Sequence, residues 1–325
     1  MITRRAGLRL AGGTILGCAL PGVALAAEFT RPLRIIVPFA PGGTSDILAR
    51  IIAPLLSEAV GQSVVVENKT GATGNIGADA VAKAGKDAHT LLLTDLGAIA
   101  LAPSLFPDLS YAPQRDLTPV GLVMFSPYVL AVNEALPVKT VAELIANAKA
   151  NPGRLAVANS GVGNANHVTA VAMARQLGIE WKSVPYRGGA AATQAVVSGE
   201  SKVIINGATA TLPFVTRGQL RGLAVTGTER IASAPDIPTF AEAGLPYADA
   251  GSWQGIMTTA GSPPELVAKL NTALAAILQR PEMVDRIKQQ GGRVVGGSPA
   301  ELGTWLAANT QSWGKVITEA GIKAE

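Results

Sequence analysis

The sequence predicts an α/β protein built from two lobes with a ligand cleft between them. Short apolar, β-branched runs alternate with segments whose apolar residues recur at helical spacing, a pattern typical of parallel strands joined by helices. Glycine-rich turns repeatedly separate a strand from the next helix, and this series occurs twice along the chain. Ligands of such folds bind at the carboxyl ends of the strands, where these turns lie.

The first unit of the series spans residues 33–61. Leu33 to Phe39 reads as a buried strand and Asp46 to Val60 as an amphipathic helix. Gly42 and Gly43 allow a tight turn between them, and Thr44 or Ser45 can cap the helix. The first N–H groups of a helix lack intrahelical partners and carry the positive end of its dipole. The unit therefore predicts a site for a carboxylate or a phosphate.

Asp46 and Arg50 allow two interpretations. Their spacing of four residues suits an ion pair on the helix surface, with the acid favoured in the first helical turn. Contact of either side chain with a ligand is the alternative.

The first lobe continues with two more strands, at residues 63–67 and 90–95. A second glycine-rich loop at 68–75 leads into a small-residue helix at 76–84, so its amides can face the same ligand as the first loop. The turn-forming residues Asn68 and Gly71 could equally serve only to reverse the chain. Residues 103–119 read as a loop rich in proline, aspartate and serine.

The second series has the same organisation. A strand at 120–125 precedes this series, within which we expect strands at 128–132, 155–158, 182–186, 203–206 and 220–226, and helices at 140–150, 168–177 and 190–197. Glycine-rich loops at 159–167 and 187–189 again precede helices. A strand at 253–259 can return to the first lobe, followed by closing helices at 264–278, 281–290 and 299–320. We therefore assign residues 27–127 plus 251–325 to lobe 1 and residues 128–250 to lobe 2, joined by a hinge of two crossings.

Composition excludes several classes of protein. With 48% hydrophobic and 15% charged residues, the 325-residue chain is globular and large enough for two cores. Outside the first 26 residues there are 24 basic and 23 acidic groups, so we expect no nucleic acid partner. Aromatic residues make up 4%, too few for base-stacking platforms.

The N-terminus has the pattern of a signal peptide at residues 1–26. Arg4, Arg5 and Arg9 precede an apolar run, and Ala24-Leu25-Ala26 resembles a signal peptidase site. We expect cleavage near Ala26 and a periplasmic product. The route stays open between general secretion and twin-arginine export, and lipoprotein cleavage before Cys18 is a third alternative.

Ordered motifs along the chain resemble a known family. The motifs are, in order, PFAPGGTSDILAR, ENKTGATGNIG, ELIANAKANPGRLAVANSGVGNANH, VPYRGG, GQLRGLAVTGTER and PDIPTFAEAGLP. Together they resemble the substrate-binding proteins of tripartite tricarboxylate transporters, the Bug family. The resemblance implies a type II periplasmic binding-protein fold that closes on a small carboxylate, without cofactor or metal. It also implies delivery of this solute to a permease made of a large and a small integral-membrane subunit. The carboxylate could be a dicarboxylate, a tricarboxylate, an amino acid or an aromatic acid.

The resemblance also implies that loop amides hold the carboxylates of the ligand, from the loops that the glycine pattern had already indicated. The candidate ligand-binding residues are Phe39, Ala40, Gly42, Gly43, Thr44, Ser45, Gly71, Ala72, Thr73, Gly74, Asp95, Ser160, Gly161, Asn164, His167, Tyr186, Gly188, Gly189 and Asn206.

Asp95 departs from the family pattern, which has small neutral residues at the end of the third strand. A carboxylate facing the cleft would repel a simple dicarboxylate and would suit a ligand with an amine or a protonated ring nitrogen. Capping of the following turn, away from the cleft, is the other interpretation. Two further departures are Asp87-Ala88-His89-Thr90, where Asp-Gly-Tyr-Thr is usual, and Gln194, where an acid is common.

An enzyme is the main alternative class. The chain has no nucleophile elbow at Ser160, no P-loop lysine motif and no Cys or His cluster for a metal. His167 could act as a base or could cap its helix locally. The glycines at 161 and 163 resemble part of a dinucleotide fingerprint, but Asn166 replaces its third glycine. We therefore expect a binding protein rather than an enzyme. A receptor for a membrane sensor kinase would need the same cleft.

Overall fold

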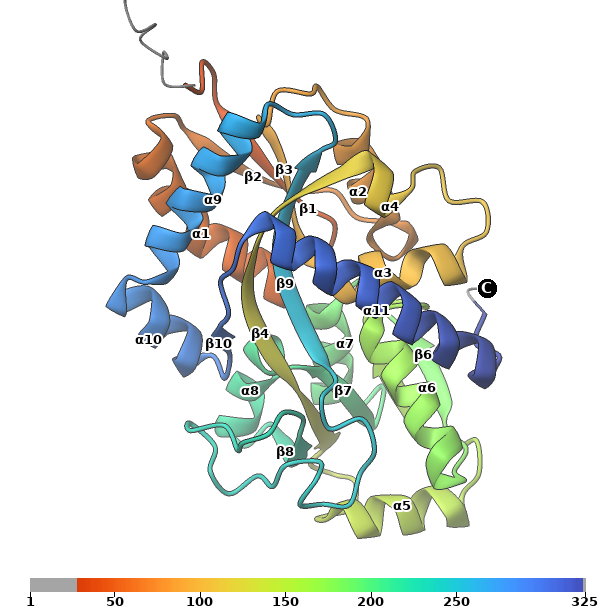
Figure 1. Ribbon diagram of the computed structural model, residues 1–325. Helices are drawn as coiled ribbons and strands as arrows, with labels where there is room; N and C mark the ends of the chain where they lie inside the picture. The colour runs from red at the N-terminus through yellow and green to blue at the C-terminus, as the bar shows by residue number, and fades with distance from the viewer. Residues whose placement is uncertain (1–27, 324–325) are drawn as a thin grey trace, which may run out of the picture.

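The computed structural model describes residues 28–323, and the expected signal peptide lies outside them. Two lobes are stacked one above the other, and two long strands run from one to the other (Figure 1). The upper lobe, lobe 1, contains the red and orange N-terminal elements together with the blue C-terminal ones. The lower lobe, lobe 2, is green and cyan.

Lobe 1 is a sheet covered by helices from both ends of the chain. Its first strands are parallel, in the order β2-β1-β3, and β9 joins them antiparallel to β3. The strands are β1 (Leu33–Val37), β2 (Val64–Asn68), β3 (Thr90–Asp95), β9 (Gly251–Thr259) and the short β10 (Arg293–Val294). The helices are α1 (Thr44–Val60), α2 (Asn75–Ala82), α3 (Leu96–Leu105), α4 (Pro113–Asp116), α9 (Pro264–Leu278), α10 (Pro281–Gln289) and α11 (Pro299–Ala320), and a short 3₁₀ turn spans Ala72–Gly74.

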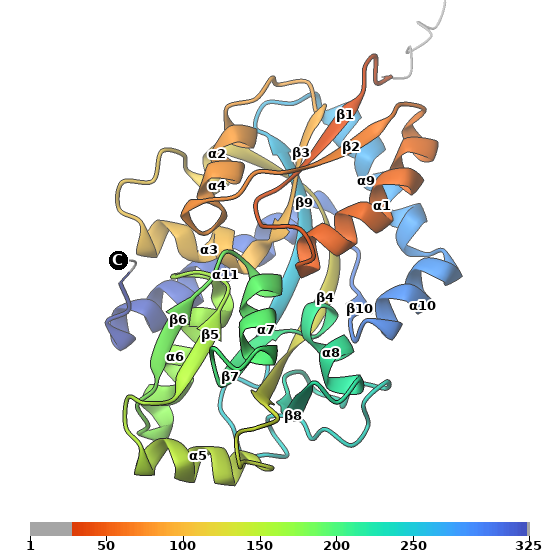
Figure 2. The ribbon, with the colours of Figure 1, turned by 180° about the vertical axis from the view of Figure 1, so that it is seen from behind.

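Lobe 2 repeats the arrangement with its own core. Its strands are β5 (Ala156–Asn159), β6 (Lys182–Pro185), β7 (Val203–Gly207) and β8 (Leu220–Val225), and its helices are α5 (Val141–Ala150), α6 (Ala165–Leu177), α7 (Gly189–Val197) and α8 (Ala208–Thr216). The reverse view in Figure 2 shows α7 and α8 beside the strands of this lobe. Each lobe buries a separate set of apolar side chains.

A single strand, β4 (Leu117–Asn133), connects the two sheets, so the expectation of separate strands at 120–125 and 128–132 was wrong. Pro127 lies between the two expected strands, and proline cannot donate to a ladder. The strand continues because it changes partners there: β9 pairs with it up to Pro127, and β7 pairs with it from Tyr128 onward. The chain returns to lobe 1 through β9. The chain therefore crosses between the lobes twice, and the exact lobe boundaries at 127/128 and 250/251 stay a prediction.

Helices α3, α4 and α8 were not expected from the sequence, and α4 lies inside the segment 103–119 that we had expected to be a loop. Nearly every residue of α3 is buried, so it has no amphipathic period to recognise, and it extends into the segment that we had expected to be a loop. Helix α8 contains Pro213 and is likewise buried along its first turns.

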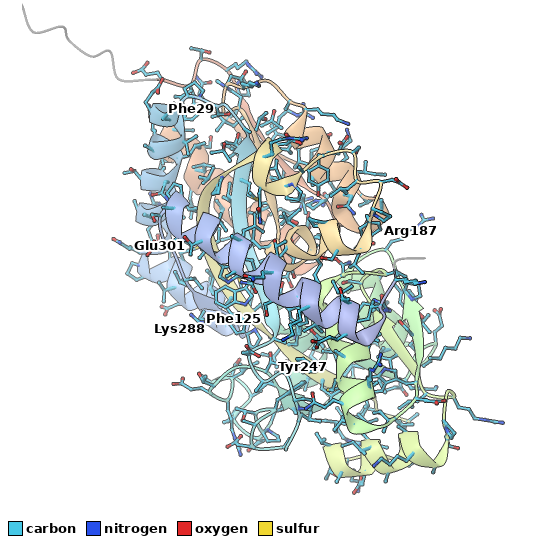
Figure 3. The ribbon with its side chains drawn as sticks, turned by 45° about the vertical axis from the view of Figure 1, so that its right-hand side comes forward. Phe29, Phe125, Arg187, Tyr247, Lys288 and Glu301 are labelled. Carbon is cyan, nitrogen blue, oxygen red and sulfur yellow. The ribbon has the colours of Figure 1, made fainter. Side chains whose placement is uncertain are left out.

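Helix α11 lies across both lobes (Figure 1). Its Ile317 packs with Leu105 of α3 and Val168 of α6, which belong to different lobes. The Trp313 ring of α11 is also stacked on Tyr247 of lobe 2, with centroids 6.4 Å apart, and Figure 3 labels Tyr247 beside this helix. No described helix is long and apolar enough to cross a membrane.

Candidate ligand-binding cleft

Three helices begin at one cavity between the lobes. The cavity is lined by Gly43, Thr44 and Ser45 at the start of α1, by residues 164–166 at the start of α6, and by Gly189 at the start of α7. The first amides of each helix have no intrahelical acceptor. Since α1 belongs to lobe 1 and the other two helices to lobe 2, an anion in the cavity would be held from both sides.

The residues that precede these helices leave the amides open. Gly43 and Gly188 occupy the N-cap positions of α1 and α7 and have no side chain with which to cap them. Asn164, the N-cap of α6, donates its side-chain amide to the Ser160 carbonyl at 2.7 Å. By contrast, Thr140 caps α5 and Ser298 caps α11, away from the cavity. Thr44 and Ser45, which we expected as caps, lie inside the first turn of α1.

A chain of hydrogen bonds crosses the lobe 1 wall of the cavity. Ser45 Oγ donates to Gln254 Oε1 at 2.7 Å, Gln254 Nε2 donates to Ser252 Oγ at 2.6 Å, and Ser252 Oγ donates to Asp95 Oδ2 at 2.6 Å. Ser45, Ser252 and Gln254 are buried. The chain fixes the start of α1 relative to β9 and the start of α3.

Asp95 caps the following helix and also lies in the cavity wall, so the two interpretations from the sequence do not exclude each other. Its Oδ1 accepts a hydrogen bond from Gly97 N at 2.9 Å and so caps α3, while the residue also lines the cavity. Burial raises the pKa of Asp95 to about 6. It carries the sole charged side chain among the described residues that line this cavity.

Nine of the nineteen predicted residues line the cavity. They are Phe39, Gly43, Thr44, Ser45, Asp95, Ser160, Asn164, Gly189 and Asn206. Five others, at 71–74 and Tyr186, line a second cavity, which Phe39 and Arg187 also line. Figure 3 labels Arg187 at the level where the lobes meet.

The remaining five predicted residues line neither cavity. Four of them, at positions 40, 42, 161 and 188, lie where the two lobes are in contact. For example, a methyl group added to Gly188 of lobe 2 would lie 3.6 Å from the backbone N of Ala40 in lobe 1. The fifth, His167, is buried and accepts a hydrogen bond from Gly163 N at Nδ1, 3.1 Å away. Burial lowers the pKa of His167, so it is a neutral local acceptor outside the cavity wall.

Asp46 also has a structural role. Its buried carboxylate accepts hydrogen bonds from Gly42 N and from the Asn68 side chain, both at 2.9 Å, and pairs with Arg50. These partners hold the glycine turn ahead of α1 in place and keep the pKa of Asp46 below its usual range, even though burial opposes this shift.

Five lining residues were missing from the prediction: Tyr128, Ala165, Asn166, Ser252 and Gln254. Ser252 and Gln254 alternate on β9, so both side chains lie on the same face of the sheet. Two polar residues at alternate positions ahead of the apolar pair Ile256 and Met257 were the signal for them. Tyr128 carries only a weak signal, a lone tyrosine in an apolar strand after Pro127.

The lobes are in contact around the cavity. Thr73 Oγ1 of lobe 1 donates to the Val162 carbonyl of lobe 2 at 2.6 Å. A methyl group placed on Gly97 of α3 would lie 2.7 Å from Cβ of Ala165 at the start of α6. The cavity is therefore bordered by surfaces of both lobes.

Comparison with known proteins agrees with this geometry. Residues 48–322 match the model of the tripartite tricarboxylate transporter family receptor. The chain belongs to this receptor family. The receptor is 35% identical to Protein BugT of Bordetella pertussis over 90% of both chains.

Two solved structures are also similar to the receptor. One is R. palustris Rpa4515 with adipate, at 36% identity and a TM-score of 0.87, covering 90% of this chain and 98% of that one. The other is the periplasmic binding protein BugD, at 32% identity and a TM-score of 0.87, covering 92% and 100%. The predicted family and two-lobed periplasmic binding-protein fold are confirmed, as is the expectation of a solute-binding receptor rather than an enzyme.

Proposed function

We propose that this receptor captures a small carboxylate in the cavity between its lobes and holds it with backbone N–H groups. The observation that carries the proposal is the convergence of the uncapped starts of α1, α6 and α7 on one cavity. Amides at helix starts provide hydrogen bonds and the positive end of the helix dipole, and hydrogen bonds to a charged acceptor are strong. No described Lys, Arg or His side chain lines this cavity, so its amides and hydroxyls supply the donors.

The side chains around the cavity support recognition by the backbone. Asn166 donates to the Ile205 carbonyl and accepts from Ser160, and Asn206 donates to the Gly189 carbonyl and to Thr193. These bonds fix the loops of lobe 2, so the amides need little rearrangement on binding.

The receptor then delivers this solute from the periplasm to a tripartite tricarboxylate-type permease with a large and a small membrane subunit. The family description, a transporter receptor, supports this role, and the signal-peptide pattern of residues 1–26 supports export. Uptake of labelled ligand by cells that contain the permease should therefore depend on the receptor.

A thermal-shift screen tests carboxylate capture. The purified receptor is heated with mono-, di- and tricarboxylates, including adipate, and with amino acids and aromatic acids. A ligand at a hundred times its dissociation constant should stabilise the fold by about 2.7 kcal/mol and raise the melting temperature measurably. Folded, ligand-free receptor that responds to no carboxylate would contradict the proposal.

A further inference from the structure

The hydroxyl of Tyr128 is a buried polar group without a partner among the described residues. Tyr128 is 2% exposed and lines the ligand cavity just beyond the point where β4 passes from one lobe to the other. Buried hydroxyls in native proteins are almost always hydrogen-bonded to protein, water or ligand. Its place in the cavity wall makes a ligand the natural partner. Burial raises the pKa of Tyr128, and the negative charge of Asp95 raises it further, so the hydroxyl stays neutral.

Asp95 lies in the wall of the same cavity as an acceptor. Each oxygen of Asp95 accepts one hydrogen bond, Oδ1 from Gly97 N and Oδ2 from Ser252 Oγ. In the series of hydrogen bonds from Ser45 through Gln254 to Ser252, every donor is directed toward this carboxylate. A carboxylate oxygen accepts more than one hydrogen bond, so both retain acceptor capacity. With its pKa at about 6, Asp95 is mostly ionised at neutral pH.

Among the described residues that line this cavity, no basic side chain balances the charge of Asp95. A basic side chain, Arg187, lines the second cavity, which shares Phe39 with the first. The helix starts provide positive potential for one carboxylate of a ligand. A second carboxylate placed near Asp95 would meet a like charge in a poorly hydrated space, where repulsion is strong.

We propose that Asp95 and Tyr128 select a carboxylic acid that also carries a protonated nitrogen, which would donate to the Asp95 carboxylate and to the Tyr128 oxygen. This inference rests on the proposed capture of a carboxylate at the helix starts. An amino acid satisfies both requirements, since its carboxylate faces the amides and its ammonium group faces the acid. The ammonium group also gives the buried hydroxyl a partner.

Matched ligand pairs test this selection at pH 7.5 by isothermal titration calorimetry. The pairs are succinate with aspartate, glutarate with glutamate, and adipate with 2-aminoadipate, whose members differ by one ammonium group. In at least one pair the amino member should bind the wild-type receptor at least tenfold more tightly.

Two variants separate the roles of the side chains. Asp95→Asn keeps the shape of the side chain and an acceptor for Gly97 N, and it should weaken the amino member at least tenfold while tightening its plain partner. Tyr128→Phe should weaken the amino member severalfold and leave the plain partner within twofold. Asp285→Asn, which removes the same charge from an exposed position on α10, is the control and should change neither affinity.

The outcomes distinguish this inference from the function on which it rests. If plain dicarboxylates bind more tightly than their amino partners and Asp95→Asn does not change that order, the selection is wrong although the receptor still captures carboxylates. If no carboxylate of any kind binds, the proposed function itself fails.

Discussion

A receptor with leucine in place of Gly97 should fold normally and bind its ligand about a hundredfold more weakly. Gly97 lies in the first turn of α3, and even a methyl group there would come within 2.7 Å of Ala165 at the start of α6. A leucine side chain would clash with α6 and keep the two lobes from closing on the ligand. The ligand would then lose the amides of lobe 2, each worth about 1.5–3 kcal/mol as a donor to a charged group, so two lost bonds give at least about a hundredfold.

Steric separation of the lobes must be distinguished from destabilisation of lobe 1 itself. Gly303→Leu on α11 is the control, because a methyl group there would meet only Pro119 of the same lobe, at 3.8 Å. Calorimetry gives the affinities, and small-angle scattering shows whether Gly97→Leu still becomes more compact with ligand. Tight binding by folded Gly97→Leu would mean that the ligand does not need the contact between α3 and α6.

Gly43→Pro should weaken binding of the ligand about 10- to 150-fold. Gly43 has φ of −79°, close to the value that proline imposes, so the substitution removes the N–H group with little change in the angle. The lost hydrogen bond to a carboxylate is worth about 1.5–3 kcal/mol.

Gly43→Ala is the matched comparison for the proline variant, since it keeps the N–H group. An added Cβ would lie 3.7 Å from the Ala40 carbonyl oxygen, an ordinary contact. The alanine variant should therefore bind far more tightly than the proline variant, with both melting near the wild-type temperature. Equal affinities of the two variants would exclude the Gly43 amide as a donor to the ligand.

The loops at the cleft could be predicted because their signal is local. A strand, one or more glycines and a helix follow one another within about a dozen residues around Gly43 and around Gly189. The physical reason for a ligand there, unpaired amides at a helix start, depends only on that local order.

The opposite wall of the cleft could not be predicted in the same way. Tyr128 and Gln254 lie on the two strands that join the lobes, and the direction of their side chains depends on how β4 and β9 pair. The position of the loop at 71–74 likewise depends on tertiary packing, which the local sequence does not determine. Its glycines do precede a helix, but the loop contacts lobe 2 through Thr73 and lines the second cavity, which shares Phe39 with the first. His167 likewise has the right position in the sequence, whereas its ring turns back to Gly163.

The most direct test of carboxylate capture by helix-start amides compares one ligand with its uncharged analogue. The carboxylate that gives the largest thermal shift is titrated into the wild-type receptor beside the same molecule with that carboxylate converted to a primary amide. Removing the charge leaves the size almost unchanged and weakens each hydrogen bond from the amides. We expect the amide to bind at least about tenfold more weakly, and equal affinity for the two molecules would contradict the account.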